Sequence, residues 1–515
     1  MQKFEIEVFK TLDEAKDEIL RTIENKSLTY EQQTFRLAKI AENIIDYPVA
    51  EDDDFYEMYR TGQICDLDEG HAPFAPRYIL PDYEKLLKEG SEFLRLTPAT
   101  NLQEAINNLL IFYRHVPSIT RFPVYIGALD TLLEPFVKEI NEENTQAIKL
   151  FLIQLDRTIN DSFCHANIGP HETNVGNIIL DLLDELQNVT PNMTLLYDAK
   201  LTPDAFAEKA VKSSLNTANP AFANLSNYKL DFKEVPFGIA SCYNALPQTG
   251  GAFTLSRVRL NKVAETAESL DDFLENKLPH VVDTMNHFME SKIKFLVEES
   301  PFFKSNFLVK EGFVELDNFV GLFGVVGLHE AVEDLSLKAG KKLVLGTDDE
   351  ALELSVKILD RLEALVANFT SKYSPVWNNK FMLHSQVGAA DDLGTTPGTR
   401  IKIGEEPELY KHLRTAARLQ RYFPSGTGDH FPFESTADKN PGAILDIFKG
   451  AFDLDMRYVS CYKADGDLIR VTGYLIKKSD LEKFNKGEQV SYDTVQYAAD
   501  ALNEYGVLDR KVQGV

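Results

Sequence analysis

The sequence has few cysteines and a deficit of basic residues. Its four cysteines lie far apart, with no C-x-x-C pair among them: Cys65, Cys164, Cys242 and Cys461. We therefore expect neither a disulfide framework nor a cysteine zinc site. Lysine and arginine number 54 against 80 aspartates and glutamates, and the formal net charge is -26. Since such a chain repels phosphate backbones and anionic lipids, we expect neither a nucleic acid polymer nor a membrane as its partner.

Long hydrophobic runs are also missing. The longest one, near Phe319 to Leu328, is about half of the ~20 residues that a membrane helix needs. The N-terminal stretch Met1-Gln2-Lys3-Phe4-Glu5 lacks the basic region and apolar segment of a secretion signal. The sequence therefore predicts a cytoplasmic protein with free thiols.

The periodicity of apolar residues indicates an α/β fold. The first half is mostly helical in pattern, with apolar residues three and four apart in Leu12 to Ile23, Tyr30 to Ile45, Leu102 to Tyr113, Thr145 to Ile159 and Val175 to Leu186. From about Val211, short apolar segments alternate with helical ones, which favours a largely buried sheet. The predicted strands are Gly238 to Tyr243, Ala252 to Leu260, Leu316 to Val326, Met382 to Val387, Arg457 to Tyr462 and Ile469 to Ile476. The predicted helices between them are Asn261 to Leu274, Ala351 to Phe369 and Pro407 to Tyr422.

The stretch Arg470-Val471-Thr472-Gly473-Tyr474 places a glycine inside an apolar, β-branched run near the C-terminus. A glycine there weakens a strand and marks a bend or a close backbone approach. The charged turn Asp465-Gly466-Asp467 before it, and apolar pairs on both sides, predict a loop tip between two buried strands. The pentapeptide alone is compatible with a simple turn glycine and with a glycine that the chemistry requires.

Cys242 ends the apolar stretch that starts at Phe237 and enters a loop with Pro247, Gly250 and Gly251. A buried structural thiol is the commonest state of a free cysteine; the alternative is a thiol exposed enough to react. No neighbouring Lys, Arg or His lowers its pKa, which argues against a thiolate nucleophile. A one-electron role needs no thiolate, because an S–H bond is weak enough to give up its hydrogen atom.

Together these stretches resemble a known family. The pentapeptide at Gly473 resembles the R-V-[ST]-G-Y glycyl radical motif, and Cys242 with its Gly-Gly loop and the Asn261-Lys262 helix resembles that superfamily's cysteine loop. The whole chain is similar in length and motif order to the YjjI-type glycyl radical enzymes, relatives of pyruvate formate-lyase and anaerobic ribonucleotide reductase. The resemblance implies that Gly473 stores a radical and that a Cys242 thiyl abstracts hydrogen from the substrate, while Arg470 and Tyr474 position the loop.

The resemblance also implies a fold, cofactors and partners. The fold would be a ten-stranded α/β barrel of two antiparallel five-stranded halves surrounded by helices. Residues 1–450 would form the helical part and the barrel with its cysteine loop, and residues 451–515 the glycyl radical segment that closes it. No metal or other permanent cofactor is implied. A separate activating enzyme, which uses S-adenosylmethionine and an iron–sulfur cluster, would install the oxygen-sensitive radical under anaerobic conditions. A homodimer is implied by the resemblance alone.

The sequence departs from the better-known branches of this superfamily. Tyr243 follows Cys242 where pyruvate formate-lyase has a second cysteine, which puts acyl relay between neighbouring thiols in doubt. Asn244 stands where the dehydratases and decarboxylases have a glutamate base, and an amide cannot take a proton. The paired C-x-x-C zinc ligands of the reductase are reduced to Cys461. Phe319 to Glu330 and Thr395 to Thr399 nevertheless resemble segments of the reductase.

Two polar clusters and a glycine series are further candidates. Cys164-His165-Ala166-Asn167 and His171-Glu172 gather potential metal or catalytic groups in what looks like a Gly/Pro loop, although such irregular spacing is more often that of a hydrogen-bonded turn. Cys164 is the candidate second thiol. Gly426 to His430 forms a loop that could line a phosphate or carboxylate. Gly321, Gly324 and Gly327 superficially resemble a nucleotide loop, but close packing is the simpler explanation.

Three functional hypotheses follow. The first is a radical enzyme that cleaves or rearranges a small polar metabolite; the second is radical chemistry on a nucleoside or nucleotide. The third is a catalytically silent barrel with a regulatory role, in which no radical forms. The substrate cannot be named from these residues.

Overall fold

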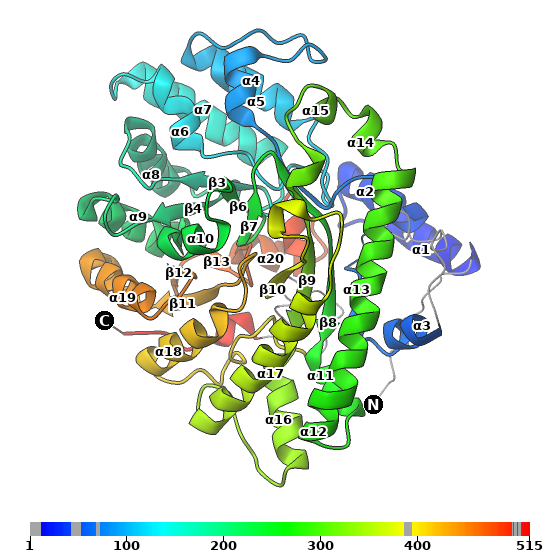
Figure 1. The fold of residues 1–515 in the computed structure, drawn as a ribbon. Helices are drawn as coiled ribbons and strands as arrows, with labels where there is room; N and C mark the ends of the chain where they lie inside the picture. The colour runs from blue at the N-terminus through cyan, green and yellow to red at the C-terminus, as the bar shows by residue number, and fades with distance from the viewer. Residues whose placement is uncertain are drawn as a thin grey trace.

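The computed structural model describes residues 12–42, 53–67, 69, 73–385, 394–496, 498, 502 and 506–514. The predicted ends of one helix at 43–45 and of one strand at 386–387 lie outside these residues. Two five-stranded sheets occupy the centre of the molecule, and helices surround them (Figure 1). This confirms the predicted α/β class.

The first sheet has the order β1-β8-β9-β10, and β2 pairs with β8 as well. Strands β8, β9 and β10 are parallel to one another, whereas β1 and β2 run antiparallel to β8. The strand bounds are β1 Ile64–Cys65, β2 Tyr78–Leu80, β8 Gly250–Arg259, β9 Phe319–Val326 and β10 Met382–Ser385.

The second sheet has the order β11-β12-β5-β4-β3 and is parallel except where β12 meets β5. Its strands are β3 His165–Ile168, β4 Asn192–Tyr197, β5 Ala221–Asn224, β11 Asp429–Phe433 and β12 Tyr458–Lys463. Strands β3 and β4 lie in the first half of the chain, so the prediction of a mostly helical first half overlooked part of the central sheet.

An isolated parallel bridge joins His384 in β10 to Gly426, which precedes the first residue of β11 by three positions. Both sheets are mixed, and within the described residues no continuous ladder closes them into one ring. The predicted closed barrel of two five-stranded halves is thus present only as two separate five-stranded sheets.

Two short hairpins carry the loops of interest into the centre. The first consists of β6 (Phe237–Ala240) and β7 (Asn244–Pro247), and the second of β13 (Leu468–Arg470) and β14 (Leu475–Lys477). Their tips are residues 241–243 and 471–474. The predicted strand pair on either side of Gly473 is confirmed.

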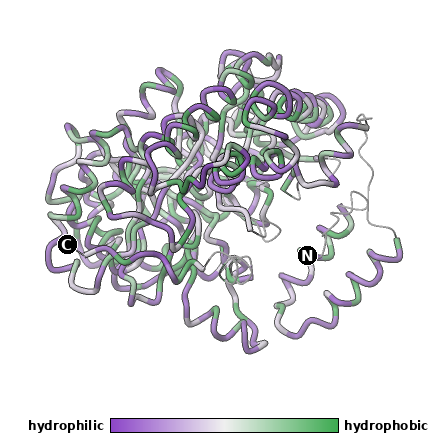
Figure 2. The backbone as a smooth tube through the Cα atoms, turned by 90° about the horizontal axis from the view of Figure 1, so that it is seen from below, coloured by the Kyte–Doolittle hydropathy of each residue, from purple (hydrophilic) through white to green (hydrophobic). Residues whose placement is uncertain are grey.

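The peripheral helices are amphipathic, and hydrophilic and hydrophobic residues alternate along many of them (Figure 2). Their bounds in the N-terminal half are α1 Leu12–Glu24, α2 Tyr30–Glu42, α3 Asp53–Arg60, α4 Tyr83–Glu89, α5 Leu102–Tyr113, α6 Leu129–Leu133, α7 Glu142–Thr158, α8 Asn174–Leu186, α9 Asp204–Thr217 and α10 Leu225–Phe232. The remaining helices are α11 Leu260–Thr266, α12 Leu270–Asp272, α13 Leu278–Lys294, α14 Phe302–Ser305, α15 Phe307–Lys310, α16 Leu328–Lys338, α17 Asp349–Asn368, α18 Leu409–Gln420, α19 Pro441–Asp453 and α20 Lys478–Asn485.

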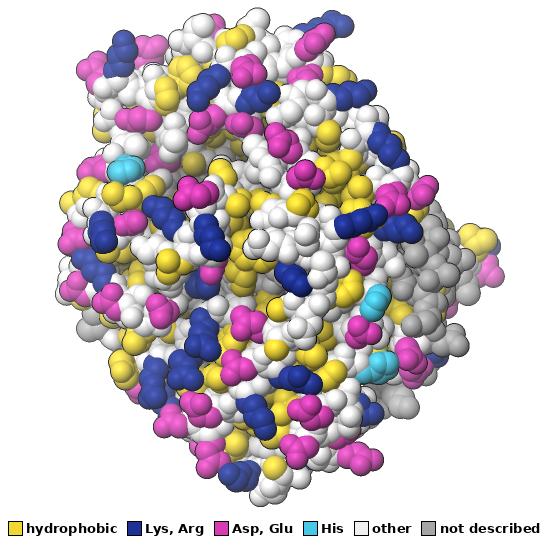
Figure 3. All heavy atoms as spheres, viewed as in Figure 1, with side chains coloured by type: hydrophobic (Ala, Val, Ile, Leu, Met, Phe, Trp, Pro, Cys, Tyr) yellow, Lys and Arg dark blue, Asp and Glu magenta, His cyan; other side chains and the backbone are white. Residues whose placement is uncertain are grey.

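The helix predicted over 261–274 is interrupted. Its first part, α11, ends at Thr266, and Ser269 then caps a new helix by accepting a hydrogen bond from the Asp272 amide. None of the helices in the described part of the chain has the length and apolar character that a membrane span needs. Acidic and basic side chains are interspersed over the face seen in Figure 3.

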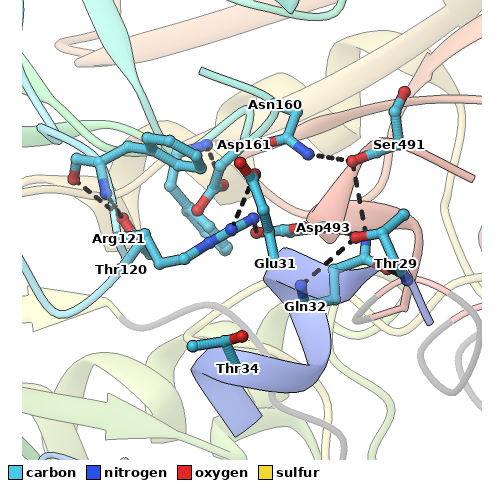
Figure 4. Close-up of polar contacts among 12 residues, drawn as sticks. Thr29, Glu31, Gln32, Thr34, Thr120, Arg121, Asn160, Asp161, Ser491 and Asp493 are labelled. Atoms are coloured by element: carbon cyan, nitrogen blue, oxygen red, sulfur yellow. Dashed lines mark hydrogen bonds and ion pairs between the residues drawn. The ribbon is translucent and has the colours of Figure 1, made fainter. Parts of the chain in front are cut away.

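The N-terminal helix α2 is fastened to the segment that follows the second hairpin (Figure 4). Gln32 Nε2 donates to the Val490 carbonyl (3.2 Å) and to Asp493 Oδ1 (3.0 Å). Arg121 pairs through Nη2 with Asp493 Oδ2 (2.7 Å). Asn160 donates to the Ser491 carbonyl and accepts from the Asp493 amide at 2.9 Å. Helix α2 is therefore held against residues 490–493, which lie more than 450 residues beyond Gln32 along the chain.

Asp161 is buried at the centre of this contact, and its titration gives a testable pH dependence. Burial, followed by the Asp493 carboxylate, raises its pKa from 3.8 to about 7. Between these two values the folded protein holds a proton that the unfolded chain has lost, so stability falls as pH rises through this window. In the wild type we expect the free energy of unfolding to fall by on the order of a few kcal/mol between pH 5 and pH 8 because of this group. Urea unfolding of Asp161→Asn at the two pH values should not show this fall. The exposed Asp17→Asn is the control, and an unchanged pH dependence in Asp161→Asn would contradict the assignment.

Candidate functional site

The cysteine loop is held rigidly at the tip of the first hairpin. Ser241 has a left-handed φ of 55°. Its amide donates to the Val124 carbonyl at 2.8 Å, and its carbonyl lies 2.6 Å from His165 Nδ1. The carbonyl of Cys242 accepts a hydrogen bond from the Tyr458 hydroxyl at 3.2 Å. The backbone of Cys242 is therefore fixed from both sides.

The Cys242 thiol is buried, with only 4% of the residue exposed, which is the commoner of the two states considered for it. The loop is covered because the second hairpin closes over it. Burial raises the pKa of Cys242 to about 12, and the thiol is therefore protonated at neutral pH. This state is unsuited to nucleophilic attack, but it keeps the hydrogen atom that a one-electron step would transfer.

Gly473 lies directly against Cys242. A Cβ built on Gly473 would overlap the Cβ of Cys242 and lie 2.9 Å from its Sγ. Glycine carries a hydrogen in the Cβ direction, so one Cα–H bond of Gly473 faces the thiol. The φ of Gly473 lies outside the left-handed region. The requirement for glycine is thus the close approach of Cys242 rather than an unusual backbone conformation.

The carbonyl of Gly473 is fixed by two buried side chains. Asn192 Nδ2 donates to it at 2.9 Å, and Arg470 Nη1 lies 3.5 Å away. Arg470 also donates from Nη2 to Asn192 Oδ1 (2.9 Å) and from Nε to the Ala218 carbonyl (2.8 Å). The Arg470 residue is fully buried, and burial lowers its pKa from the ordinary value. Arg470 therefore links the glycine loop to β4.

Two further arginines donate hydrogen bonds to backbone carbonyls in and beside the glycine loop, residues 471–474. Arg400 donates to the Thr472 carbonyl (3.0 Å) and to the Tyr243 hydroxyl (3.2 Å), so it touches both loops. Arg510 donates to the carbonyls of Arg470 (2.6 Å) and Val471. Sequence reasoning missed Arg400, Arg510 and Asn192, since no local motif marks them and their role depends on tertiary contacts.

The other predicted residues occupy different positions. Tyr474 is buried, with its ring centroid 5.1 Å from that of Phe163. Asn244 follows the cysteine tip and is buried, and its Oδ1 has no hydrogen-bond partner within the described structure. Both residues are close to the two loops in sequence and share their enclosed surroundings.

The cluster at Cys164 is not the Gly/Pro loop that the sequence indicated, because His165 to Ile168 form strand β3. Cys164 is buried, and burial raises the pKa of its thiol. His165 Nε2 lies 2.7 Å from Thr194 Oγ1, and burial lowers the pKa of this imidazole to about 3, which keeps it neutral. His171 and Glu172 are exposed. No group of three potential ligands is arranged to hold a metal among the residues that the structure places.

The glycine-rich segments pack closely, as predicted. A Cβ on Gly321 would lie 2.5 Å from the Phe381 ring, and one on Gly324 would lie 2.8 Å from Arg257 Cβ. The two segments that resemble the reductase meet, since the Gly327 amide donates to the Thr396 carbonyl at 3.0 Å. Packing therefore explains this series without a nucleotide.

A conservative change at Arg470 tests the anchoring of the loop. Arg470→Lys keeps the charge but cannot serve the Ala218, Asn192 and Gly473 acceptors together. We expect a loss of about 1–3 kcal/mol in the free energy of unfolding, with faster hydrogen exchange in residues 468–477. The control is Arg361→Lys in α17, whose exposed pair with Glu275 should contribute less than about 1 kcal/mol. Equal effects of the two variants would contradict the anchoring role.

Comparison with known proteins gives this geometry its context. The sequence profile of the family described as "Glycyl radical enzyme YjjI-like" matches residues 28–513. A Haemophilus influenzae protein is 44% identical over 501 residues, covering 96% of this chain and 97% of its own. The Escherichia coli protein YjjI is 40% identical over 485 residues, covering 94% and 93%.

Solved structures share the fold at low sequence identity. Hydroxyproline dehydratase from Clostridioides difficile aligns with a TM-score of 0.66 at 13% identity, covering 97% of this chain and 88% of its own. The anaerobic ribonucleotide reductase from Thermotoga maritima aligns with a TM-score of 0.64 at 14% identity, covering 92% and 89%. The fold, the sequence profile and the two relatives agree, and the chain belongs to the YjjI-like glycyl radical enzyme family.

Proposed function

We propose that Gly473 stores the radical and that Cys242 transmits it to a small polar organic substrate. The observation that carries this proposal is the contact of the two residues, in which a Cα–H of Gly473 points at the Cys242 side chain, nearest to its Cβ and next to its Sγ. In the first step the Cys242 S–H bond breaks and a Cα–H bond forms on Gly473, which leaves a thiyl radical. The thiyl then takes a hydrogen atom from a substrate C–H bond, and the hydrogen returns after the bond is cleaved or rearranged.

The surroundings of the two residues support this chemistry. The raised pKa of Cys242 keeps the transferable hydrogen on sulfur. Burial of both loops excludes water from the radical intermediates. Arg470, with Asn192, positions the loop through the Gly473 carbonyl, and Tyr474 supports it by packing. Cys164 has no role in these steps.

Activation by a partner requires the glycine loop to open, because a buried Gly473 is out of reach of any external catalyst. We infer that a radical S-adenosylmethionine enzyme installs the radical after residues 451–515 have opened. Opening breaks the hydrogen bond from Arg400 to the Thr472 carbonyl (3.0 Å) and the pairing of Ser162 Oγ with the Leu475 amide (2.9 Å). No permanent cofactor on this chain enters the proposal.

The reaction class follows from Asn244. Its amide cannot act as the general base of a dehydratase-type elimination, so we propose a bond cleavage or rearrangement without such a base. The alternative is a nucleotide substrate, since the Thermotoga maritima reductase of similar fold was solved with dATP and CTP. The hydroxyproline dehydratase structure contains trans-4-hydroxy-L-proline, which is a small polar molecule.

Electron paramagnetic resonance tests the proposal. Anaerobic incubation with the cognate activating enzyme, S-adenosylmethionine and a reductant is expected to give a glycyl doublet. Absence of any radical under conditions that activate a known glycyl radical enzyme would favour a catalytically silent barrel. Mass spectrometry of the activated protein mixed with small hydroxylated acids and, separately, nucleotides then distinguishes the two substrate classes.

A further inference from the structure

A cavity of about 230 Å³ lies beside the glycine loop, between the segment after β10 and the C-terminal residues. Its wall includes Thr472, Arg400, His412, His430 and Arg510. Neither Cys242 nor Gly473 lines it, so it is separate from their contact, which it adjoins through Thr472 and through Arg400 and Arg510. Its volume is below the ~300–1,000 Å³ of sites for drug-sized ligands, which limits an occupant to a small molecule.

Three buried side chains in this wall have polar atoms without a partner in the part of the chain that the structure describes. They are His430 Nε2, His412 Nδ1 and Thr472 Oγ1, and their residues are 2%, 4% and 1% exposed. The other ring nitrogen of each imidazole has a hydrogen-bond partner. His430 Nδ1 is paired with Ser460 Oγ, and His412 Nε2 is paired with Asp429 Oδ2. Leaving such groups buried and unpaired is costly, and three of them around one cavity indicate a missing polar occupant.

The inner end of the cavity is cationic. Arg400 donates hydrogen bonds from Nε and Nη2 to uncharged oxygen atoms. Its buried Nη1 has no partner within the described residues. Neither Arg400 nor Arg510 forms an ion pair with a described carboxylate. Burial lowers the pKa of His430 well below its ordinary value, and the nearby arginines, Arg400 first, lower it further. This imidazole is therefore neutral and leaves the arginines as the inner positive charges.

Four carboxylates also line the cavity, and the buried one, Asp429, has its pKa lowered against the effect of burial, by His412 first and also by Arg400. Asp429 is engaged by His412 at 2.9 Å, and Glu330 accepts from the amide and hydroxyl of Thr396. Asp509 is exposed and Glu406 half-buried, and both lie toward solvent, as Lys402 does. Solvent screens those outer charges more strongly than the inner ones.

We propose that this cavity binds a small organic anion, with its carboxylate or phosphate on Arg400 Nη1 and hydrogen bonds to His430 and Thr472. Thr472 belongs to the glycine loop, whereas Arg400 and His430 belong to the surrounding fold. A bound anion therefore connects the two and holds the loop in its closed position. By linkage, a ligand that binds the closed form more tightly opposes opening of the loop.

Isothermal titration calorimetry of the radical-free protein tests the site independently of the radical chemistry. The probes are inorganic phosphate, glycerol phosphate and lactate, with uncharged glycerol as the comparison. We expect at least one anion to bind saturably and more tightly than glycerol. Whether the phosphates or lactate bind more tightly then shows whether the site prefers a phosphate or a carboxylate group. Hydrogen exchange in residues 468–477 should slow when that anion is bound.

Matched variants locate the binding. Thr472→Val should weaken it by on the order of tenfold, while Thr472→Ser keeps the hydroxyl and should bind as the wild type does. Arg400→Gln should weaken it by tenfold or more, and Thr415→Val, buried outside the cavity wall, should have no effect. The proposal is overturned if no anion binds better than glycerol, or if both Thr472 variants bind as the wild type does. The Thr472 pair decides the matter even if Arg400→Gln fails to fold.

Discussion

Gly473→Ala is expected to abolish the glycyl doublet of the activated protein completely. The added methyl group would overlap Cys242 Cβ and push the two loops apart. It would also hinder the near-planar geometry over which a Cα radical is delocalised into the flanking amide and carbonyl. The measurement is spin quantitation by electron paramagnetic resonance after anaerobic activation, together with circular dichroism to show that the variant is folded.

Gly450→Ala is the matched control for this experiment. Gly450 lies in α19, and a Cβ there meets nothing within 4 Å. Because alanine also suits a helix better than glycine does, this variant should be at least as stable as the wild type and should keep the full doublet. A doublet that survives Gly473→Ala would place the radical on another residue and remove the central assignment.

Cys242→Ser is expected to keep the radical but to block hydrogen transfer. An O–H bond is much stronger than an S–H bond, so the serine cannot pass its hydrogen to Gly473. Turnover should fall by on the order of 10³-fold or more once a substrate is known. The activation contacts are unchanged, since serine fits the buried position of the thiol.

Solvent deuterium makes this prediction testable before any substrate is identified. In D₂O the Cys242 thiol exchanges to S–D, and reversible transfer then replaces the Gly473 Cα hydrogen by deuterium. The wild-type doublet should therefore collapse to a singlet, whereas Cys242→Ser should keep its doublet over the same time. Cys65→Ser, in the remote strand β1, should collapse as the wild type does. If the doublet of Cys242→Ser collapsed as fast as that of the wild type, a group other than Cys242 would be exchanging the Cα hydrogen of Gly473.

The sequence singled out Gly473 and Cys242, the two residues that we propose to react, because their signals are local. The pentapeptide around Gly473 and the strand end at Cys242 can be read without knowing what they touch. Their burial could not be read in the same way, since each loop is covered by the other. Asn192 illustrates the limit: it reaches Gly473 from β4, 281 residues away along the chain.

Strand β3 shows why part of the fold was missed. His165 and Asn167 are polar residues beside Gly169 and Pro170, and such a composition is typical of a turn. In the structure both side chains are paired inside the core, with Asn167 exchanging hydrogen bonds of 2.9 Å with the backbone of Ile239. Tertiary pairing therefore outweighs local propensity here. The closed barrel was an expectation from resemblance, and the described ladders form two separate sheets.

The contact between α2 and residues 490–493 has a consequence for how the protein is made. Gln32 and Asp493 are 461 residues apart, and Asp493 follows the glycine loop in the chain. Helix α2 also contacts α1 and pairs Glu31 with Arg121, and these partners precede residues 490–493 in the chain by more than 350 residues. Contacts of such long sequence separation form late and slowly. We therefore expect the contact between α2 and residues 490–493 to form later than contacts between neighbours in the chain.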